Sequence, residues 1–171
     1  MKKVLTALIL AACCLVAAAP TFANQSVQNN KEEQQMTQEF STVFPTGAKN
    51  DAYAQYFVGQ SYLNMLSLEQ VVIGNVTFEP GCRNNWHIHH ADKGGGQILL
   101  VTGGRGYYQE WGKEPRELHP GDVVNIPAGV KHWHGAAPTS WFAHIAVEVP
   151  GENMRNEWCE PVDAQAYNAL K

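Results

Sequence analysis

The stretch WHIHHADKGGGQILL, residues 86–100, places three histidines just before a glycine-rich segment and an apolar run. Successive side chains of a strand point to opposite faces, so residues two apart point the same way. His87 and His89 therefore share one face, and His90 lies on the other. The glycines permit a tight return that would bring Gln97, at the head of the next predicted strand, beside the pair. We interpret the stretch as one half of a metal site rather than as a surface loop.

A second segment, KHWH at residues 131–134, repeats this pattern and places His132 and His134 on one face. In the strand predicted from Trp141, His144 and Glu148 also share a face. Burying so many imidazoles without partners would be costly, and a divalent cation removes that cost because neutral imidazole binds several transition metals. One histidine alone would be interpreted as a core or surface residue, but two such segments favour a metal site. The periodicity does not show that the two segments meet.

Short segments rich in Val, Ile, Tyr and Phe recur along the chain, separated by Gly, Pro and Asn. Regularly spaced short strands predict an all-β sandwich or barrel. Asp163 can cap a short helix near the C-terminus, over residues 164–170. The predicted strands cover residues 53–58, 70–78, 97–102, 106–111, 122–126 and 141–149.

The length and composition indicate one domain, and the mild acidity points to no particular ligand. The chain has 171 residues and a net charge of -4, from 12 basic and 16 acidic residues. No basic cluster is present, which argues against a nucleic-acid partner. Beyond the first residues, no segment is long and apolar enough to span a bilayer.

The N-terminal residues 1–23 have the form of a signal peptide: Lys2 and Lys3, an apolar run, and small residues before a cleavage site at Ala23. The protein is therefore expected to be exported, to the periplasm or outside the cell. An alternative is a lipoprotein anchored through Cys13, because residues 10–13 resemble a bacterial lipobox. Residues 24–45 are interpreted as a flexible polar leader, and residues 46–171 as a single domain. Cys82 and Cys159 would remain after cleavage, either as a disulfide or as two unpaired thiols.

The two histidine segments resemble the paired motifs of the cupin superfamily. Gly81, His87-Ile88-His89, Gln97 and Gly104 are similar to the first cupin motif, and Gly121, Pro127-Ala128-Gly129 and His132 to the second. The resemblance covers about residues 46–149. It implies a double-stranded β-helix, the cupin jelly-roll barrel, in which both motifs meet at one metal. Gln97 stands where that family usually has an acidic ligand, with seven residues between it and His89, and Ala136 stands where the family usually has Asn.

Residues 119–124 (HPGDVV) and 126–147 (IPAGVKHWHGAAPTSWFAHIAV) narrow the resemblance. They are similar to small single-domain cupins that include bacterial manganese-dependent hydroxynitrile lyases and cupins associated with carboxymuconolactone decarboxylase-like proteins. The resemblance implies one divalent ion per domain, manganese by analogy, with zinc, iron or copper as alternatives. It implies that His134 transfers a proton beside the metal, with His144 nearby. The implied metal ligands are His87, His89, Gln97 and His132.

The lyase group tends to carry glutamine where this chain has Glu148. Glu148 is also a candidate catalytic residue, and its carboxylate is expected to raise the pKa of a nearby unligated imidazole. Three imidazoles and an amide leave a divalent ion its full charge, so it would be a strong Lewis acid.

The sequence thus predicts a metal-dependent lyase that acts on a small hydroxy or carbonyl compound, with His134 as proton shuttle. An iron-dependent cupin dioxygenase and a non-catalytic module that binds metal or a small metabolite are the alternatives. A homodimer or higher homo-oligomer is expected by analogy, because cupins often associate through edge strands.

Overall fold

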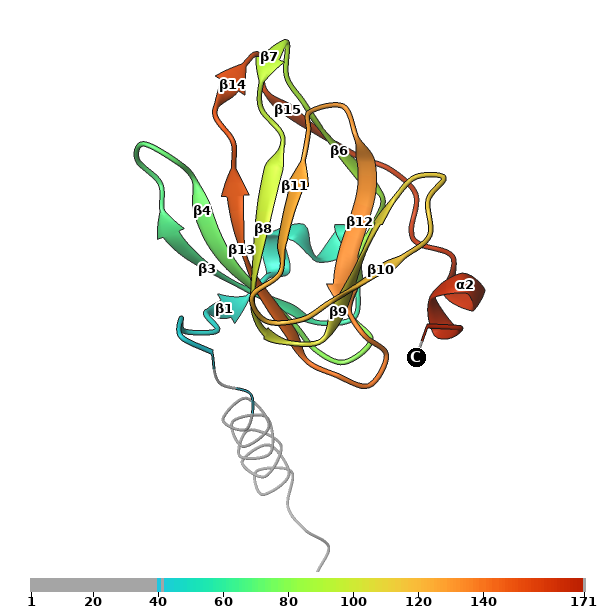
Figure 1. The fold of residues 1–171 in the computed structure, drawn as a ribbon. Coiled ribbons are helices and arrows are strands. Elements are labelled where there is room, and N and C mark those ends of the chain that lie inside the picture. Colours follow the sequence, from blue (N-terminus) through green and yellow to red (C-terminus); the bar gives the residue numbers. More distant parts are fainter. Residues whose placement is uncertain (1–39, 41, 171) are drawn as a thin grey trace, which may run out of the picture. The chain divides into compact units, whose positions relative to one another are not determined.

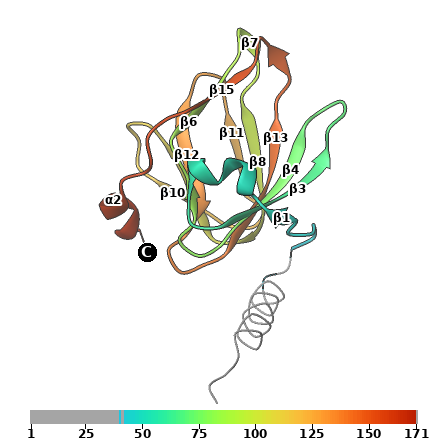
Figure 2. The same cartoon turned by 180° about the vertical axis from the view of Figure 1, so that it is seen from behind.

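The computed structural model describes residue 40 and residues 42–170. The predicted signal peptide, the lipid site at Cys13 and most of the predicted polar leader lie outside these residues. The described chain consists mainly of antiparallel strands in two sheets that face each other, with one short α-helix near its C-terminal end (Figures 1 and 2). This is the all-β architecture with a short C-terminal helix that the sequence predicts.

The first sheet has six strands in the order β1-β3-β4-β13-β8-β11. Every neighbouring pair in it is antiparallel, and the pairing of β13 with β8 shifts register between Ala143 and His144. Its strands are Ala48–Lys49 (β1), Ser61–Ser67 (β3), Ile73–Phe78 (β4), Phe142–Glu148 (β13), Gln97–Gly104 (β8) and Val123–Ile126 (β11).

The second sheet has seven strands in the order β10-β9-β12-β5-β2, with β6 beside β12 and β15 beside β6. A separate short pair joins β14 (Gly151–Glu152) to β7 (Lys93–Gly94). The strands of the second sheet are Arg116–Leu118 (β10), Gly106–Glu110 (β9), Lys131–Ala136 (β12), Arg83–Asn84 (β5), Phe57–Val58 (β2), His87–His90 (β6) and Arg155–Trp158 (β15).

Apolar side chains on the inward faces of the two sheets form the main core, as alternation along half-buried strands requires. Its largest members are Phe78, Leu99 and Phe142, each fully buried. His134 and His144 border this core, because their rings contact Phe78 and Phe142. The remaining buried members are Cys82, Val101, Leu118, Val124, Ile126 and Ala136.

The C-terminal segment covers the outer face of the second sheet. Asp163 accepts a hydrogen bond from the backbone N–H of Ala166 and so caps α2 (Ala164–Asn168), as predicted, although the helix is shorter than residues 164–170. Tyr167 of this helix is buried against Trp133 and donates its hydroxyl hydrogen to the carbonyl of Ala136 at 2.6 Å. The Arg83 guanidinium lies 3.9 Å from the Tyr167 ring centroid.

Two predicted strands are wrong in part. Residues 53–58 are mostly a 3-10 helix, Asp51–Tyr56, and only β2 is extended. The content of Tyr, Phe and Val predicts a strand there, but Tyr56 ends the 3-10 helix and its ring stacks on Trp158 with 4.5 Å between the ring centroids. The strand predicted for residues 70–78 begins at Ile73. Strand β3 was not predicted, although Leu63 and Met65, which line an interior cavity, alternate with Tyr62 and Asn64.

The glycine-rich segment makes the predicted tight return. Gly96 has φ of 93°, and a Cβ atom there would lie 2.2 Å from the carbonyl oxygen of Ile126. A larger residue would therefore be excluded by both backbone conformation and space. Gln97 begins β8 and lines the same cavity as His87 and His89.

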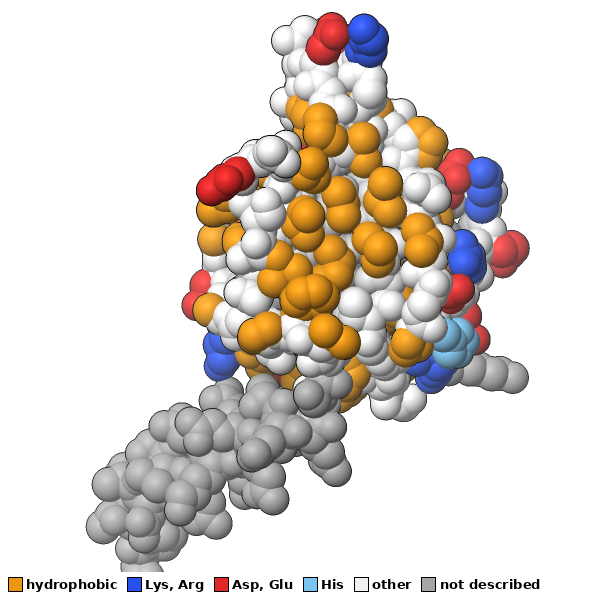
Figure 3. All heavy atoms as spheres, turned by 60° about the vertical axis from the view of Figure 1, so that its left-hand side comes forward, with side chains coloured by type: hydrophobic (Ala, Val, Ile, Leu, Met, Phe, Trp, Pro, Cys, Tyr) orange, Lys and Arg blue, Asp and Glu red, His pale blue; other side chains and the backbone are white. Residues whose placement is uncertain are grey.

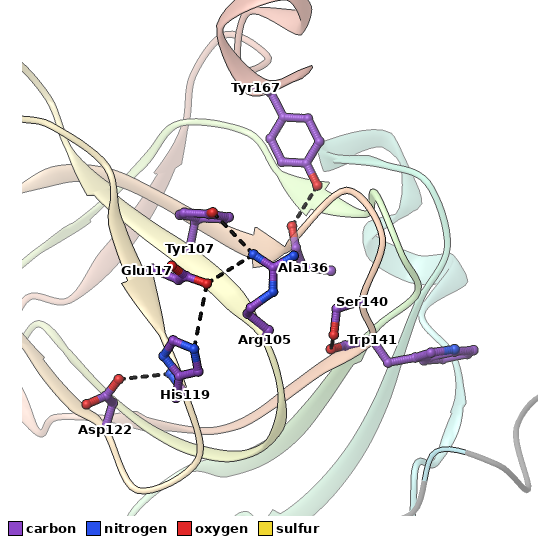
Figure 4. A network of polar contacts seen from close by, with 9 residues as sticks. All are labelled: Arg105, Tyr107, Glu117, His119, Asp122, Ala136, Ser140, Trp141 and Tyr167. Carbon is purple, nitrogen blue, oxygen red and sulfur yellow. Dashed lines mark hydrogen bonds and ion pairs between the residues drawn. The ribbon is translucent and has the colours of Figure 1, made fainter. Parts of the chain in front are cut away.

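Polar contacts hold the β9–β10 hairpin, on the outer side of the barrel (Figure 4). Arg105 donates to a Glu117 carboxylate oxygen at 3.0 Å, and the backbone N–H of His119 donates to Asp122 at 2.8 Å. These groups are partly exposed, so each contact contributes little to stability.

Both described cysteines have free thiols, Cys82 buried and Cys159 half-buried, so the structure has the unpaired alternative. Among residues 40 and 42–170, no helix is both long and apolar enough to cross a membrane.

Candidate metal centre

Both predicted histidine segments lie on the second sheet and face the barrel interior. Strands β6 and β12 pair in an antiparallel register that sets His87 directly opposite His132, with ring centroids 4.2 Å apart. The structure therefore brings together the two segments whose meeting the sequence left open. His87, His89, His132 and His134 are all buried, as their shared facing predicts.

The first sheet contributes three polar side chains to the same interior. Gln97 lies at the start of β8, directly opposite Glu148 of β13, and His144 lies farther along β13. Gln97 and His144 are buried, whereas Glu148 is partly exposed. The site is thus built between two sheets and not on one loop.

Hydrogen bonds to the Nδ1 atoms fix the tautomers of three histidines. Nδ1 of His87 lies 3.0 Å from the carbonyl oxygen of Asn85, and Nδ1 of His132 lies 2.9 Å from that of Val130. A carbonyl oxygen only accepts, so each Nδ1 carries the hydrogen and each Nε2 keeps its lone pair. Nδ1 of His89 likewise donates to Glu148 at 3.2 Å.

The lone pairs left over fit a divalent metal ion. Nε2 of His89, Nε2 of His132 and Oε1 of Gln97 are buried and have no hydrogen-bond partner among the described residues. Buried acceptors without partners are costly, and imidazole nitrogen and amide oxygen are common metal ligands. Histidines whose Nδ1–H is held by an oxygen are typical of metal sites. The interior can therefore hold a metal ion.

His134 offers a second way to complete the site. One nitrogen each of His87, His132 and His134 lie within 4.8 Å of one another, close enough to surround an ion. Both ring nitrogens of His134, however, already have partners: Nδ1 lies 3.1 Å from His144 Nε2, and Nε2 lies 3.1 Å from Asn84 Nδ2. These two bonds leave His134 without the free lone pair that a metal ligand needs.

Asn84 is the residue of this site that the sequence analysis missed. Its Oδ1 accepts the backbone N–H of His134 at 2.9 Å, which turns its NH₂ group toward the His134 ring. The nearer ring atom is Nε2, at 3.1 Å against 3.3 Å for Nδ1. Since the amide can only donate there, Nε2 carries the lone pair and Nδ1–H donates to His144. Asn84 belongs to β5, which has only two residues, and no pattern in the sequence marks it.

Burial keeps these imidazoles neutral. Desolvation holds the pKa of His87 and of His134 well below the ordinary value of 6.5, and the neighbouring histidines lower both further. Desolvation also lowers the pKa of His132 and of His144 to about 4. The pKa of His134 therefore lies well below the near-neutral range that is usual for a proton-transferring histidine, because its ring is fully enclosed.

The prediction that the Glu148 carboxylate raises the pKa of an unligated imidazole is wrong. This carboxylate contacts His89, and the pKa of His144 is lowered rather than raised. The two residues share a face, but they are four positions apart along β13, so the carboxylate reaches the metal-site end of the strand. His90, on the opposite face of β6, pairs with Glu157 at 2.7 Å outside the barrel.

A cavity of about 190 Å³ opens beside these residues. At roughly 30 Å³ per water, it can hold a small organic molecule. His87, His89, Gln97 and His134 line its inner wall, and its described lining contains one carboxylate, Glu148, and no Lys or Arg. The rest of the wall is mainly apolar or aromatic: Tyr53, Phe57, Leu63, Met65, Val72, Val76, Ala146 and Trp158.

The low pKa of His144 predicts acid sensitivity of the metal-free protein. In the unfolded chain this imidazole titrates near 6.5, and in the folded protein at about 4. Between these values the unfolded state binds more protons, so the free energy of unfolding falls as the pH is lowered. Between pH 7 and pH 4, this imidazole should lower the free energy of unfolding by an amount on the order of 3 kcal/mol, and the His144→Gln variant should lack that decrease. Urea unfolding at both pH values measures it, and equal losses in the two proteins would contradict this account.

Three comparisons with known proteins agree with this geometry. A family model described as "Cupin domain" matches residues 74–145. An (R)-mandelonitrile lyase of Granulicella tundricola is 45% identical over 93 residues, which cover 54% of this chain and 68% of the lyase.

Among solved structures, a cupin-like protein from Thermotoga maritima superposes with a TM-score of 0.66 at 36% identity, covering 77% of this chain and 98% of that one. A cupin 2 conserved barrel domain protein from Rhodopseudomonas palustris shares the fold at a TM-score of 0.51 and 14% identity, over 66% of this chain and 80% of that one. The predicted cupin jelly-roll barrel is therefore confirmed. The chain is 45% identical to the lyase over 68% of the lyase, and 36% identical to the Thermotoga protein over 98% of that protein. It therefore belongs to the cupin family.

Proposed function

We propose that this protein is a metal-dependent lyase that breaks or forms a C–C bond next to a hydroxyl or carbonyl group of a small neutral molecule. The observation that carries the proposal is the position of His134, a neutral imidazole whose ring nitrogens bond Asn84 and His144, in a cavity lined also by His87, His89 and Gln97. The relative from Granulicella tundricola, named for cleavage of a cyanohydrin, supports the same reaction class.

The proposed ligands are Nε2 of His87, His89 and His132 and Oε1 of Gln97. The tautomers fixed by Asn85, Val130 and Glu148 aim a lone pair from each of these histidines. A divalent ion held there would supply Lewis-acid polarisation of a substrate hydroxyl or carbonyl.

His134 would move the proton. It is neutral at physiological pH because of burial, and its lone pair lies on Nε2, so that atom accepts a hydrogen from a substrate hydroxyl. Its Nδ1–H stays bonded to His144, which keeps the ring oriented. Asn84 would be a positioning residue, since its amide selects the tautomer and is displaced when the substrate donates instead.

The cavity wall favours a neutral, partly apolar substrate. The described lining offers no cation to pair with a carboxylate, and Glu148 would repel one. Hydroxy acids therefore fit less well than aldehydes, ketones and their cyanohydrins. The aromatic side chains of Tyr53, Phe57 and Trp158 offer a surface for the substituent on the reacting carbon.

A substrate screen tests the proposal. The purified protein, loaded in turn with manganese, zinc, iron and copper, is assayed with cyanohydrins, hydroxy acids and catechols while oxygen is monitored. We expect metal-dependent release of aldehyde and cyanide without oxygen consumption. Turnover that consumes oxygen would establish the dioxygenase alternative, and metal binding without any turnover would establish the non-catalytic one.

Glu148 is expected to strengthen metal binding through His89. A carboxylate that accepts the Nδ1–H of a ligand makes its Nε2 a better donor, and loss of such a partner weakens metal affinity about 10- to 100-fold. Glu148→Gln keeps the hydrogen bond but removes the charge, so we expect a dissociation constant raised about tenfold. The control Glu152→Gln changes an exposed carboxylate that pairs with Lys93. Equal affinity in the wild-type and Glu148→Gln proteins, measured by competition with a chelator, would contradict this role.

We also propose that residues 1–23 direct export and that the metal is acquired outside the cytoplasm. Residues 1–23 contain no twin arginine, so we expect the chain to be exported unfolded. The metal site would then form only after transport, where the affinity of the site and the availability of each metal select the ion. Imidazole-rich sites bind copper and zinc more tightly than manganese. Protein isolated from its native compartment should therefore start at Asn24 and contain mainly zinc or copper. Mass spectrometry and elemental analysis test both points, and mostly manganese would contradict the second.

A further inference from the structure

The C-terminal strand β15 lies on the far side of β6 from β12. It pairs with β6, the strand that carries His87 and His89, in an antiparallel register that sets Trp158 opposite His87. One further backbone hydrogen bond continues this pairing, from the N–H of Cys159 to the carbonyl of Trp86 at 2.8 Å. Figures 1 and 2 both show β15 running alongside β6. The strand that supplies two proposed ligands is thus held between β12 and β15.

Trp158 joins this strand to the ring of His87. The two rings are stacked, with 4.8 Å between their centroids and 29° between their planes. The indole also stacks on Tyr56 of the 3-10 helix, with 4.5 Å between the centroids and 4° between the planes. Trp158 lines the cavity beside the metal site as well. Three segments that are distant in the sequence therefore meet at one indole.

The ring of His87 needs such a contact to keep its orientation. The last side-chain torsion of a histidine has a broad energy profile, so covalent geometry does not fix the plane of the ring. The hydrogen bond from Nδ1 to the carbonyl of Asn85 directs one ring atom, and the stacked indole resists rotation of the ring plane. A metal ligand must be held within about 0.5 Å of its binding geometry. Without the indole, metal binding would have to order the ring itself.

Strand β15 has little apolar area of its own to hold it in place. Among the described strands it pairs only with β6. Its first three residues are exposed, and only Trp158 is partly buried. Figure 3 shows hydrophobic side chains gathered over the outer side of the first sheet, whereas the exposed residues of β15 are polar. The pair of Glu157 with His90 is partly exposed and contributes little. An edge strand of this kind opens locally at a low free energy.

We propose that Trp158 is a positioning residue of the metal site, and that metal binding and the docking of β15 favour each other through it. The indole keeps the His87 ring in place for the metal, and the bound metal keeps that ring in place for the indole. Such coupling is reciprocal: the factor by which docked β15 raises the metal affinity equals the factor by which metal favours docking. This inference rests on the ligand role proposed for His87.

Matched substitutions test the positioning role. Trp158→Leu keeps an apolar side chain but removes the stack. We expect its dissociation constant for zinc, measured by competition with a chelator, to rise about 10- to 100-fold, the usual effect of losing a residue that orients a metal ligand. Trp158→Phe keeps an aromatic ring and should restore most of the affinity.

The control for these variants is Trp111→Leu. It changes an exposed indole that contacts Trp86 and Lys131 and does not line the cavity, so it should bind zinc as the wild type does. Equal zinc affinity in the Trp158→Leu and wild-type proteins would overturn the positioning role, and so would an equal loss of affinity in Trp111→Leu.

Hydrogen exchange of the wild type tests the coupling without any substitution. Relative to protein with chelator, saturating zinc should slow backbone exchange in residues 155–158 by a similar factor, about 10- to 100-fold. Strand β10, an edge strand of the same sheet, provides the control and should exchange at the same rate in both conditions. No slowing in residues 155–158, or equal slowing in β10, would overturn the coupling.

Both measurements report metal binding rather than turnover, so their failure is distinct from a failure of the proposed lyase reaction. A wild type that binds no zinc would overturn the inference outright.

Discussion

His134→Gln is expected to lower kcat about 10²- to 10⁴-fold, the usual contribution of a general acid–base group, while metal stoichiometry stays unchanged. The reason is that Asn84 and His144 hold both ring nitrogens of His134, so we expect the ring to transfer a proton and not to bind the metal. Glutamine remains polar in this buried place but cannot take up a proton near neutral pH.

The matched control for this variant is His90→Gln, which changes a histidine on the outer face of β6 that pairs with Glu157. It should leave both kcat and metal content near their wild-type values. Loss of bound metal in His134→Gln would instead make His134 a ligand, as its proximity to His87 and His132 allows. Elemental analysis and steady-state kinetics on the same preparations separate the two roles.

His132→Ala is expected to remove stoichiometric metal and, with it, the stability that metal binding adds. A ligand bound only by the folded state stabilises it by about 3 kcal/mol when its free concentration exceeds the dissociation constant about a hundredfold. The wild type should therefore melt at a higher temperature with added metal than with chelator, and His132→Ala should melt at the same temperature in both.

Measuring each protein with and without metal separates two effects on the melting temperature: the loss of the bound ion and the cavity that alanine leaves. His89→Ala should behave in the same manner, because its Nε2 is also buried without a partner. His90→Ala again provides the control and should keep the full metal-dependent rise. A full rise in His132→Ala or His89→Ala would remove that residue from the ligand set.

The sequence predicted the fold and the histidine faces because both depend on local alternation. His87 and His89, and His132 and His134, differ by two positions, so any strand puts each pair on one face. What joins the two pairs is the register of β6 with β12, which is a long-range pairing that periodicity does not contain. The match to two cupin motifs supplied that information.

The sequence analysis missed or misassigned those parts of the site that depend on which neighbour a side chain contacts, or that lie in very short strands. Asn84 acts through one amide that bridges β5 to the ring of His134, and a two-residue strand has no periodicity to reveal it. Glu148 was assigned to His144 by facing alone, whereas the carboxylate is nearer to His89 because Gln97 and the end of β6 lie beside it. The low pKa of His134 follows from burial, which the sequence does not measure.

The most direct test of the central claim is a crystal structure of the manganese-loaded protein, with anomalous scattering measured at the manganese absorption edge. We predict one ion bound by Nε2 of His87, His89 and His132 and by Oε1 of Gln97, with His134 unligated and still bonded to His144. An ion held by His87, His132 and His134, with His89 and Gln97 outside its coordination sphere, would contradict the account.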